Sequence, residues 1–350
     1  MPSLVLIVPG QLNTRTGGYI YDRHVVQGLR SRGWHVDVLE LDEDFPHPSA
    51  GSLERTAGVL GLLPDGELVL IDGLAFGAMP DVAIRESSRL RLVALVHHPL
   101  ALETGLDPGR ALALEASERR ALAAARRVVV TSRATAAGLS RYGVPRDRID
   151  VAEPGTDRAE VARGSGSESV ALLTVAAIVP RKSHDRLVEA LASIPERNWR
   201  LTCAGSLDRD PATAARLRAM IDSCGLADRI AFVGEQNEEE LAGLYDSSDV
   251  FVLPSDHEGY GMALAEALAR GLPIIATPTG AAVELIDRGD DAAGILVEIG
   301  NRRELESALS RVVGDPLERK RLAAAARRRR ESLPTWDDTC ARMAEALARV

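Results

Sequence analysis

Lysine is nearly absent from this chain of 350 residues. Lys182 and Lys320 are the only two, and the other Lys/Arg positions are all arginine. Aromatic residues make up 3% of the sequence, and the formal net charge is −9. Nucleic-acid surfaces combine a basic face with stacking aromatic side chains, and this composition offers neither. We therefore expect no nucleic-acid partner.

Cysteine and long apolar runs are also scarce. Cys203, Cys224 and Cys340 form an odd, widely spaced set without zinc-ligand spacing, which fits a reducing cytoplasm. No apolar run approaches the roughly 20 residues of a membrane-spanning helix. The first apolar run, LVLIVP, is too short for a signal peptide and lacks its basic start. The sequence thus predicts a cytoplasmic protein.

The length and the order of apolar runs predict two α/β domains. A chain of 350 residues is ample for two buried cores. Strand-like runs alternate with helical stretches, which is typical of parallel sheets. The first series of expected strands covers 4–8, 34–41, 67–71, 91–97, 127–131 and 149–152. The second series covers 170–176, 199–204, 230–233, 250–253, 273–276 and 294–297.

A polar stretch separates the two series. We predict a Rossmann-like N-terminal domain over 1–157, a linker over 158–169, a second domain over 170–333 and a closing helix over 334–350. Two such sheets would place a ligand cleft between them, at the carboxyl ends of the strands.

The stretch from Ser255 to Thr277 carries the strongest motif. An apolar strand is followed by Glu258, then Gly259-Tyr260-Gly261, then the helix-forming run MALAEALAR, which stops at Gly271. The backbone N–H groups of Gly261, Met262 and Ala263 would lie at the positive end of the helix dipole. Such an end is a ready site for a phosphate.

Glu258 and Glu266 frame this helix start with seven residues between them. The rise along the helix places their carboxylates roughly 10 Å or more apart. A retaining hydrolase pair needs about 5–5.5 Å and an inverting pair about 6.5–9.5 Å. They could instead hold the two ends of a long ligand, such as a nucleotide sugar. The alternative is that Glu266 is a solvated helix residue and Glu258 an ordinary loop acid.

EGYGMALAEALARGLPIIAT, followed by PTGAAVELI, resembles the donor-site signature of retaining glycosyltransferases of family 4. The resemblance covers nearly the whole chain. It implies the GT-B fold, with two Rossmann-like parallel-sheet domains facing a central cleft, and a nucleoside-diphosphate sugar as donor without a metal or other cofactor. It also implies that the closing helix crosses back onto the N-terminal domain, with Trp336 as a packing anchor.

Arg181 and Lys182 form a second cluster, at a strand-to-helix turn where two cations could neutralise a leaving diphosphate. The segment resembles the family's G-R-L-x-x-x-K-G, with Lys182 on the diphosphate lysine. The usual arginine falls on Ala177 and the second glycine on Ser183, so we infer that Arg181 replaces the missing cation. The alternative is a surface pair that begins a helix.

The N-terminal half adds fewer candidates. The loop after the first strand ends in Gly17-Gly18 at a helix start and is not the dinucleotide motif G-x-G-x-x-G. By resemblance, Gly17 and Gly18 lie against the donor, and His97 matches a histidine near the reacting sugar. The predicted acceptor contacts are Arg15, Tyr19 and His98; His98 takes the place of His97 if the strand register shifts by one.

The predicted site is completed by roles that follow from the resemblance. Glu258 binds sugar hydroxyls, Glu266 binds ribose hydroxyls, and the turn 232–236 contacts the base mainly through its backbone. The predicted catalytic residues are Glu258, His97, Arg181 and Lys182. The remaining predicted donor contacts are Gly17, Gly18, Gly234, Glu235, Gly259, Tyr260, Gly261, Met262, Ala263 and Glu266.

Three further features are assigned structural roles. Glu118 is predicted to be a helix surface residue. The D-x-D of Asp208 and Asp210 is predicted to cap a helix rather than bind a metal, so no metal site is predicted. The arginine run 327–330 is predicted to be a solvated helix face, with a weak peripheral membrane contact as the alternative.

The resulting hypothesis is a metal-independent retaining glycosyltransferase. It would move a hexose or similar sugar from a nucleoside-diphosphate sugar to a small-molecule, glycan or lipid acceptor. Alternatives are a sugar phosphorylase or nucleotide-sugar epimerase of the same fold, and a non-catalytic nucleotide-sugar-binding protein. A phosphorylase of this fold needs a cofactor lysine, and the chain has only two lysines. No feature of the sequence indicates an oligomeric state.

Overall fold

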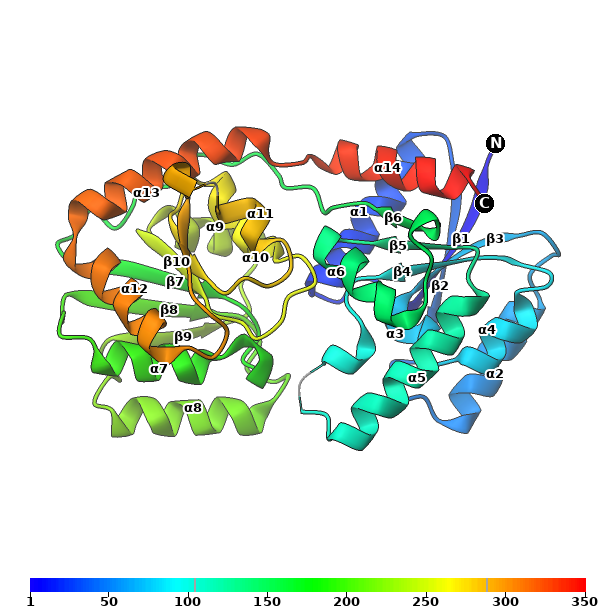
Figure 1. Ribbon diagram of the computed structural model, residues 1–350, viewed down its shortest axis with the longest axis horizontal. Coiled ribbons are helices and arrows are strands. Elements are labelled where there is room, and N and C mark those ends of the chain that lie inside the picture. Colours follow the sequence, from blue (N-terminus) through cyan, green and yellow to red (C-terminus); the bar gives the residue numbers. More distant parts are fainter. Residues whose placement is uncertain (104, 288) are drawn as a thin grey trace. The chain divides into compact units, whose positions relative to one another are not determined.

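The structure, a computed structural model, describes residues 1–103, 105–287 and 289–350. It divides into two compact units. The first unit comprises 1–155 with 334–350, and the second comprises 156–333. Each unit is built on one parallel sheet (Figure 1).

The first unit has a six-stranded sheet in the order β2-β1-β3-β4-β5-β6. Its strands are β1 Ser3–Pro9, β2 His35–Leu41, β3 Leu68–Asp72, β4 Arg91–Val96, β5 Arg127–Val130 and β6 Ile149–Val151. Its helices are α1 Gly17–Ser31, α2 Ala50–Gly61, α3 Gly73–Phe76, α4 Pro80–Glu86, α5 Pro108–Ala124, α6 Arg133–Gly138 and α14 Trp336–Ala348. The chain leaves β1 toward β2 and returns to β3 on the other side, so the strand order reverses between β1 and β3.

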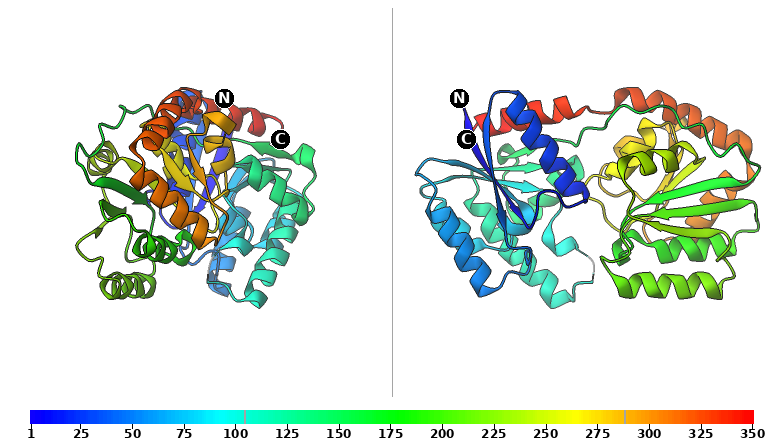
Figure 2. Two further views of the ribbon diagram at one scale, coloured as in Figure 1. Left: turned by 60° about the vertical axis from the view of Figure 1, so that its left-hand side comes forward. Right: turned by 180° about the vertical axis from the view of Figure 1, so that it is seen from behind.

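Helix α14 packs on the first unit although it ends the chain. Its residues Met343, Ala346 and Leu347 join the hydrophobic cluster of β1 and α1. The Trp336 ring stacks on His24 with ring centroids 3.8 Å apart. A Cβ at Gly28 would lie 2.2 Å from Cys340 Sγ, so only glycine permits this approach of α1 to α14. The two helices lie side by side in Figures 1 and 2.

The second unit has a six-stranded sheet in the order β12-β11-β10-β7-β8-β9. Its strands are β7 Val170–Val175, β8 Trp199–Ala204, β9 Ile230–Gly234, β10 Val250–Leu253, β11 Ile274–Ala276 and β12 Gly294–Leu296. Its helices are α7 His184–Ser193, α8 Pro211–Ser223, α9 Glu238–Asp246, α10 Met262–Ala269, α11 Ala282–Ile286, α12 Arg302–Gly314 and α13 Pro316–Arg329. Here the strand order reverses between β7 and β10.

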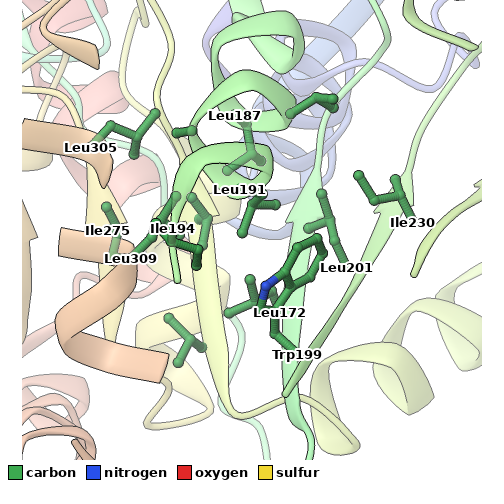
Figure 3. Packing of buried hydrophobic residues seen from close by; sticks show 14 of the residues in the cluster. Leu172, Leu187, Leu191, Ile194, Trp199, Leu201, Ile230, Ile275, Leu305 and Leu309 are labelled. Atoms are coloured by element: carbon green, nitrogen blue, oxygen red, sulfur yellow. The ribbon is translucent and has the colours of Figure 1, made fainter. Parts of the chain in front are cut away.

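Trp199 anchors one core of the second unit, beneath α7 and α12 (Figure 3). Its side chain is fully buried, its indole Nε1 donates to Glu196 O at 3.1 Å, and the Arg229 guanidinium lies 5.0 Å from its ring centroid. A buried tryptophan needs such a hydrogen-bond partner. This core fixes the sheet from whose strand ends the site loops emerge.

The parallel two-sheet fold predicted from the sequence is confirmed, but 158–169 differs from the predicted linker. This segment lies along the second unit, where Ala162 N donates to Arg270 O at 2.9 Å and Gly164 N to Asp246 O at 2.9 Å. Asp249 Oδ1 accepts from Ser165 N at 3.0 Å. The polar composition suggested a linker, but these backbone N–H groups are satisfied by acceptors from other parts of the second unit.

Among the described residues, no helix combines the length and the apolar character that crossing a membrane requires. The exposed large apolar side chains are scattered over both units, as is normal for a protein surface.

Candidate functional site

Two loops of the second unit meet where the strand order reverses. One follows β7 and carries Arg181 and Lys182; the other follows β10 and carries Glu258. Arg181 joins them, because its backbone O accepts from Asp256 N at 2.8 Å and its Nη1 donates to His257 O at 3.1 Å. In open parallel sheets, ligands bind at the carboxyl ends of the strands at such a reversal.

Lys182 and Glu258 form an ion pair in this place. Lys182 Nζ lies 2.6 Å from Glu258 Oε1, and the side chains are 15% and 8% exposed. Burial alone would raise the pKa of Glu258, but Lys182 and Arg181 hold this pKa below its usual value. The carboxylate therefore stays ionised at neutral pH and can accept hydrogen bonds from hydroxyl groups.

The start of α10 lies directly after this pair in the chain. Gly261 occupies the N-cap position with φ 100°, and it has no side chain to cap the helix. The backbone N–H groups of Met262 and Ala263 are therefore not capped by the N-cap residue. An anion can satisfy them, and the helix dipole favours one there.

Gly280 fixes the backbone of the Glu258 loop from the other side. Its φ is +56°, and a Cβ there would lie 2.7 Å from Tyr260 O and 3.0 Å from Glu258 O. Ala281 N donates to Tyr260 O at 2.9 Å. The glycine of the PTG segment is thus required for close backbone approach.

Glu266 lies one turn inside α10 and is held by a buried tyrosine. Tyr245 Oη donates to Glu266 Oε2 at 2.9 Å, and the Arg270 guanidinium lies 4.5 Å from the Tyr245 ring centroid. Burial raises the pKa of Glu266, while Tyr245 and Arg270 oppose that rise. Sequence reasoning missed Tyr245, because it comes from α9 and no motif links it to Glu266.

A cavity of about 480 Å³ lies at the ends of β8 and β9. Its lining includes the predicted contacts Gly234 and Glu235 together with Asp208 and Arg218. Asp210 caps α8, since its Oδ1 accepts from Thr213 N at 2.9 Å, as the sequence predicted. Asp208 contributes to the cavity instead.

The first unit has its own polar cluster where its strand order reverses. Gly18 lies in the first turn of α1, and a Cβ there would be 3.3 Å from His97 Cδ2. His97 Nε2 lies 3.3 Å from carboxylate oxygens of both Asp22 and Asp72. Sequence reasoning missed both acids, although Asp72 ends the strand LVLID beside the strand that leads to His97.

The other predicted residues of the first unit are placed as follows. Gly17 begins α1, and Arg15 is exposed in the preceding loop. The Tyr19 hydroxyl donates to Pro9 O. His98 Nε2 lies 3.2 Å from Glu103 Oε2.

The prediction for Glu118 was wrong. Its side chain is 1% exposed and its Oε2 accepts from Leu100 N at 2.9 Å. The reason is its position on the buried face of α5, which it shares with Leu114, Ala121 and Leu122. Burial raises the pKa of Glu118 to about 8.

The arginine run 327–330 is only partly a solvated face. Arg327 and Arg328 are exposed, and Arg328 pairs with Asp291. Arg329 Nε donates to Leu285 O at 3.0 Å, and Arg330 donates to Ala159 O. These guanidinium groups serve contacts within the second unit.

Two family models match the chain. "Glycosyl transferases group 1" matches residues 157–329, and "Glycosyltransferase Family 4" matches residues 67–160. A D-inositol 3-phosphate glycosyltransferase of Xylanimonas cellulosilytica is 30% identical over 248 residues, covering 66% of this chain and 58% of that protein. An MMP alpha-(1->4)-mannosyltransferase of Mycolicibacterium hassiacum is 26% identical over 337 residues, covering 90% of this chain and 80% of that protein.

The chain thus spans only part of such relatives, down to 50% of a D-inositol 3-phosphate glycosyltransferase of Salinispora tropica. Solved structures agree on the fold. Sucrose-phosphate synthase from Thermosynechococcus elongatus has a TM-score of 0.83 at 22% identity, covering 100% of this chain and 99% of that one. HepE from Anabaena, solved with UDP-glucose, has a TM-score of 0.78 at 18% identity, and the match covers 99% of this chain and 100% of that one.

Two parallel six-stranded sheets, the helix start framed by Glu258 and Glu266, and the two adjoining family models lead to one assignment. The chain belongs to the family 4 type of GT-B glycosyltransferases.

Proposed function

We propose that this protein transfers a hexosyl group from a nucleoside-diphosphate sugar to a hydroxyl group of an acceptor, with retention of anomeric configuration and without a metal ion. The ion pair of Lys182 and Glu258 beside the uncapped start of α10 carries the proposal. It combines a cation for the diphosphate with an ionised carboxylate for the sugar hydroxyls.

In the proposed reaction the sugar C1–O bond breaks, and its electron pair leaves with the diphosphate. The acceptor oxygen forms the new bond to C1, and the acceptor proton passes to the released diphosphate. Negative charge grows on the leaving group, so Lys182, Arg181 and the start of α10 stabilise the transition state more than the ground state. His97 is proposed to serve the same reaction.

Glu258 is proposed to orient the sugar rather than to attack it. One of its oxygens is engaged by Lys182 Nζ at 2.6 Å. Glu266 would accept hydrogen bonds from the ribose hydroxyls, in an orientation fixed by Tyr245. The cavity lined by Gly234, Glu235 and Arg218 is the proposed place of the base.

The names of the relatives support a hexose as the group transferred and a small polyol phosphate among the acceptors to test first. The HepE structures contain UDP-glucose, so uridine donors belong in the first screen. Guanosine and adenosine donors complete it, because the cavity does not select a base by its lining alone.

The test is a matrix of UDP-, GDP- and ADP-hexoses against acceptors, with nucleoside diphosphate release and product formation measured in parallel. We expect one donor to give acceptor-dependent release, with the α- or β-configuration of the donor kept in the product. Sugar 1-phosphate formed from a glycoside and inorganic phosphate would instead identify a phosphorylase, and conversion of the donor into its epimer an epimerase. Donor binding without turnover would identify a binding protein.

A further inference from the structure

Asp22, Asp72 and His97 form a buried polar cluster in the first unit whose acids have no role in the proposed reaction so far. The three residues come from α1, the end of β3 and the residue after β4. Their side chains are 0%, 4% and 19% exposed. His97 Nε2 lies 3.3 Å from Asp22 Oδ1 and 3.3 Å from Asp72 Oδ2, so one ring nitrogen faces two carboxylates.

The surroundings fix the histidine in one place. The Tyr21 ring meets the His97 ring edge to face, with centroids 5.3 Å apart and an interplanar angle of 84°. Gly18 permits α1 to approach the ring, and Thr131 Oγ1 donates to His97 O at 3.2 Å. The ring is therefore held at its edge, at its face and through its backbone.

Asp72 is itself held in position. Its Oδ1 accepts from Leu74 N at 2.7 Å at the start of α3, which leaves Oδ2 directed at His97. Asp22 is fully buried, and its Oδ2 has no hydrogen-bond partner among the described residues. Two carboxylates buried to this degree require a neighbouring positive charge or a proton.

The charges around the cluster supply that positive charge on His97. Burial alone would lower the pKa of His97, but Asp22 and Asp72 raise it to about 10. Burial, together with the charge of Asp72, raises the pKa of Asp22 to about 6, against the opposing effects of His97 and Arg23. Arg23 Nη1 is directed elsewhere, to Leu12 O at 2.7 Å. The ring is then an imidazolium at neutral pH, with Nδ1–H as its remaining donor.

We propose that Asp22 and Asp72 are positioning residues that hold His97 as an imidazolium in a single orientation, so that its Nδ1–H serves as a fixed cationic hydrogen-bond donor to an oxygen of a bound substrate. The last step rests on the proposed function. The holding of His97 by the two acids does not, and it can be measured without any substrate.

The first measurement is the titration of His97 by NMR on histidine-labelled full-length protein. The chain has seven histidines, and the His97 signal is assigned by its loss in His97→Gln. We expect its midpoint above pH 8 in the wild type and at least one pH unit lower in Asp72→Asn and in Asp22→Asn. Asp81→Asn, at an exposed acid of the same unit, is the control and should leave the midpoint unchanged. Using two acid variants keeps the test usable if one fails to fold.

The second measurement is transfer kinetics of the same variants with the donor found in the screen. We expect kcat to fall at least tenfold in Asp72→Asn, with little change in donor KM and full activity in Asp81→Asn. A wild-type His97 midpoint near 6.5, or one unchanged in both acid variants, would overturn the holding of His97. A lowered midpoint with unchanged kcat would overturn the role of His97 in the transfer reaction.

A divalent cation is the competing occupant, since one ligand atom from each of Asp22, Asp72 and His97 lies within 4.8 Å of the others. Stoichiometric Zn²⁺ or Mn²⁺ that shifts or broadens the His97 signal, with reversal by EDTA, would replace the proposal by a metal site. Signals unaffected by either ion support it. The NMR outcome holds even if no sugar donor is ever turned over, so the two proposals can fail separately.

Discussion

Lys182 is the residue on which the proposed chemistry depends most. If it stabilises the leaving diphosphate, Lys182→Ala should lower kcat/KM by 10²-fold or more, which corresponds to about 2.7–4 kcal/mol of lost transition-state stabilisation. The matched control is Lys320→Ala, which removes the one other lysine, exposed on α13. Steady-state kinetics of the two variants give the comparison.

Loss of Lys182 also leaves Glu258 buried without its partner, which costs about 3–5 kcal/mol of folding stability. Thermal unfolding must therefore accompany the kinetics, and Lys182→Met with Glu258→Gln removes both charges together. A folded Lys182→Ala protein with wild-type kinetics would mean that the turn after β7 only begins a helix.

The two acids should differ in their kinetic effects. Glu266→Gln should mainly raise donor KM, because it weakens contacts to the ribose. Glu258→Gln should mainly lower kcat, because Glu258 orients the sugar at the reacting carbon. Both parameters are measured with saturating acceptor. Variants that lose stability but keep donor KM and kcat would remove both residues from the site.

Single residues show where sequence reasoning reaches its limit. Lys182 and Glu258 could be predicted because each lies in a local motif, but their 2.6 Å contact could not. Tyr245 and Asp22 were missed because their partners come from other elements and are brought close only by packing. Asp72 had a signal, an acid at the carboxyl end of a buried strand, which was not used.

The segment after β11 should matter as much as the motif itself. Gly280→Ala would place a Cβ 2.7 Å from Tyr260 O and force a left-handed conformation, which costs about 1–2 kcal/mol. We expect at least tenfold slower transfer and a lower Tm. Gly300→Ala is the control, because its φ is +76° and no atom lies within 4 Å of its Cβ. It should lower Tm alone. Equal transfer rates in the wild type and Gly280→Ala would show that the Glu258 loop tolerates displacement.

Glu118 on α5 should impose a pH dependence on stability. Its pKa is about 8 in the folded protein and about 4.3 when unfolded, so the folded state holds a proton that the unfolded state lacks. Stability from this group therefore falls as pH rises from about 4.3 to 8, by up to about 1.4 kcal/mol per pH unit.

Urea unfolding between pH 5 and 8 tests this. Glu118→Gln mimics the protonated acid and should flatten the decline, whereas Glu54→Gln, at an exposed acid of α2 in the same unit, should not. Identical slopes in the wild type and Glu118→Gln would place the proton elsewhere.

The positions of strands were predicted better than which face of a helix is buried. The strands before Lys182 and Glu258 are short apolar runs bounded by turn residues, and the structure has them within a residue or two of the expected bounds. Glu118 was misplaced because one charged residue on a helix gives no sign of which face the fold will bury.

The two-unit organisation followed from the alternation of strands and helices, since parallel sheets need helical crossovers. The limits of the units followed less well, because segment 158–169 is polar yet bound to the second unit through Asp246, the last residue of α9, and Asp249, which precedes β10. The composition of segment 158–169 could be read from the sequence, but its contacts could not, because they depend on where the fold places Asp246 and Asp249.

The central claim is that a nucleoside diphosphate binds through side-chain cations and a helix start, without a metal. Calorimetric titration of the wild type with UDP, GDP and ADP in EDTA, and again with Mn²⁺, tests it most directly. We predict that one nucleoside diphosphate binds in EDTA, with Kd within about threefold of its value in Mn²⁺, since the ligand's charge is met by Lys182, Arg181 and α10. Binding that occurs only with Mn²⁺ and is abolished by Asp208→Ala would contradict the account.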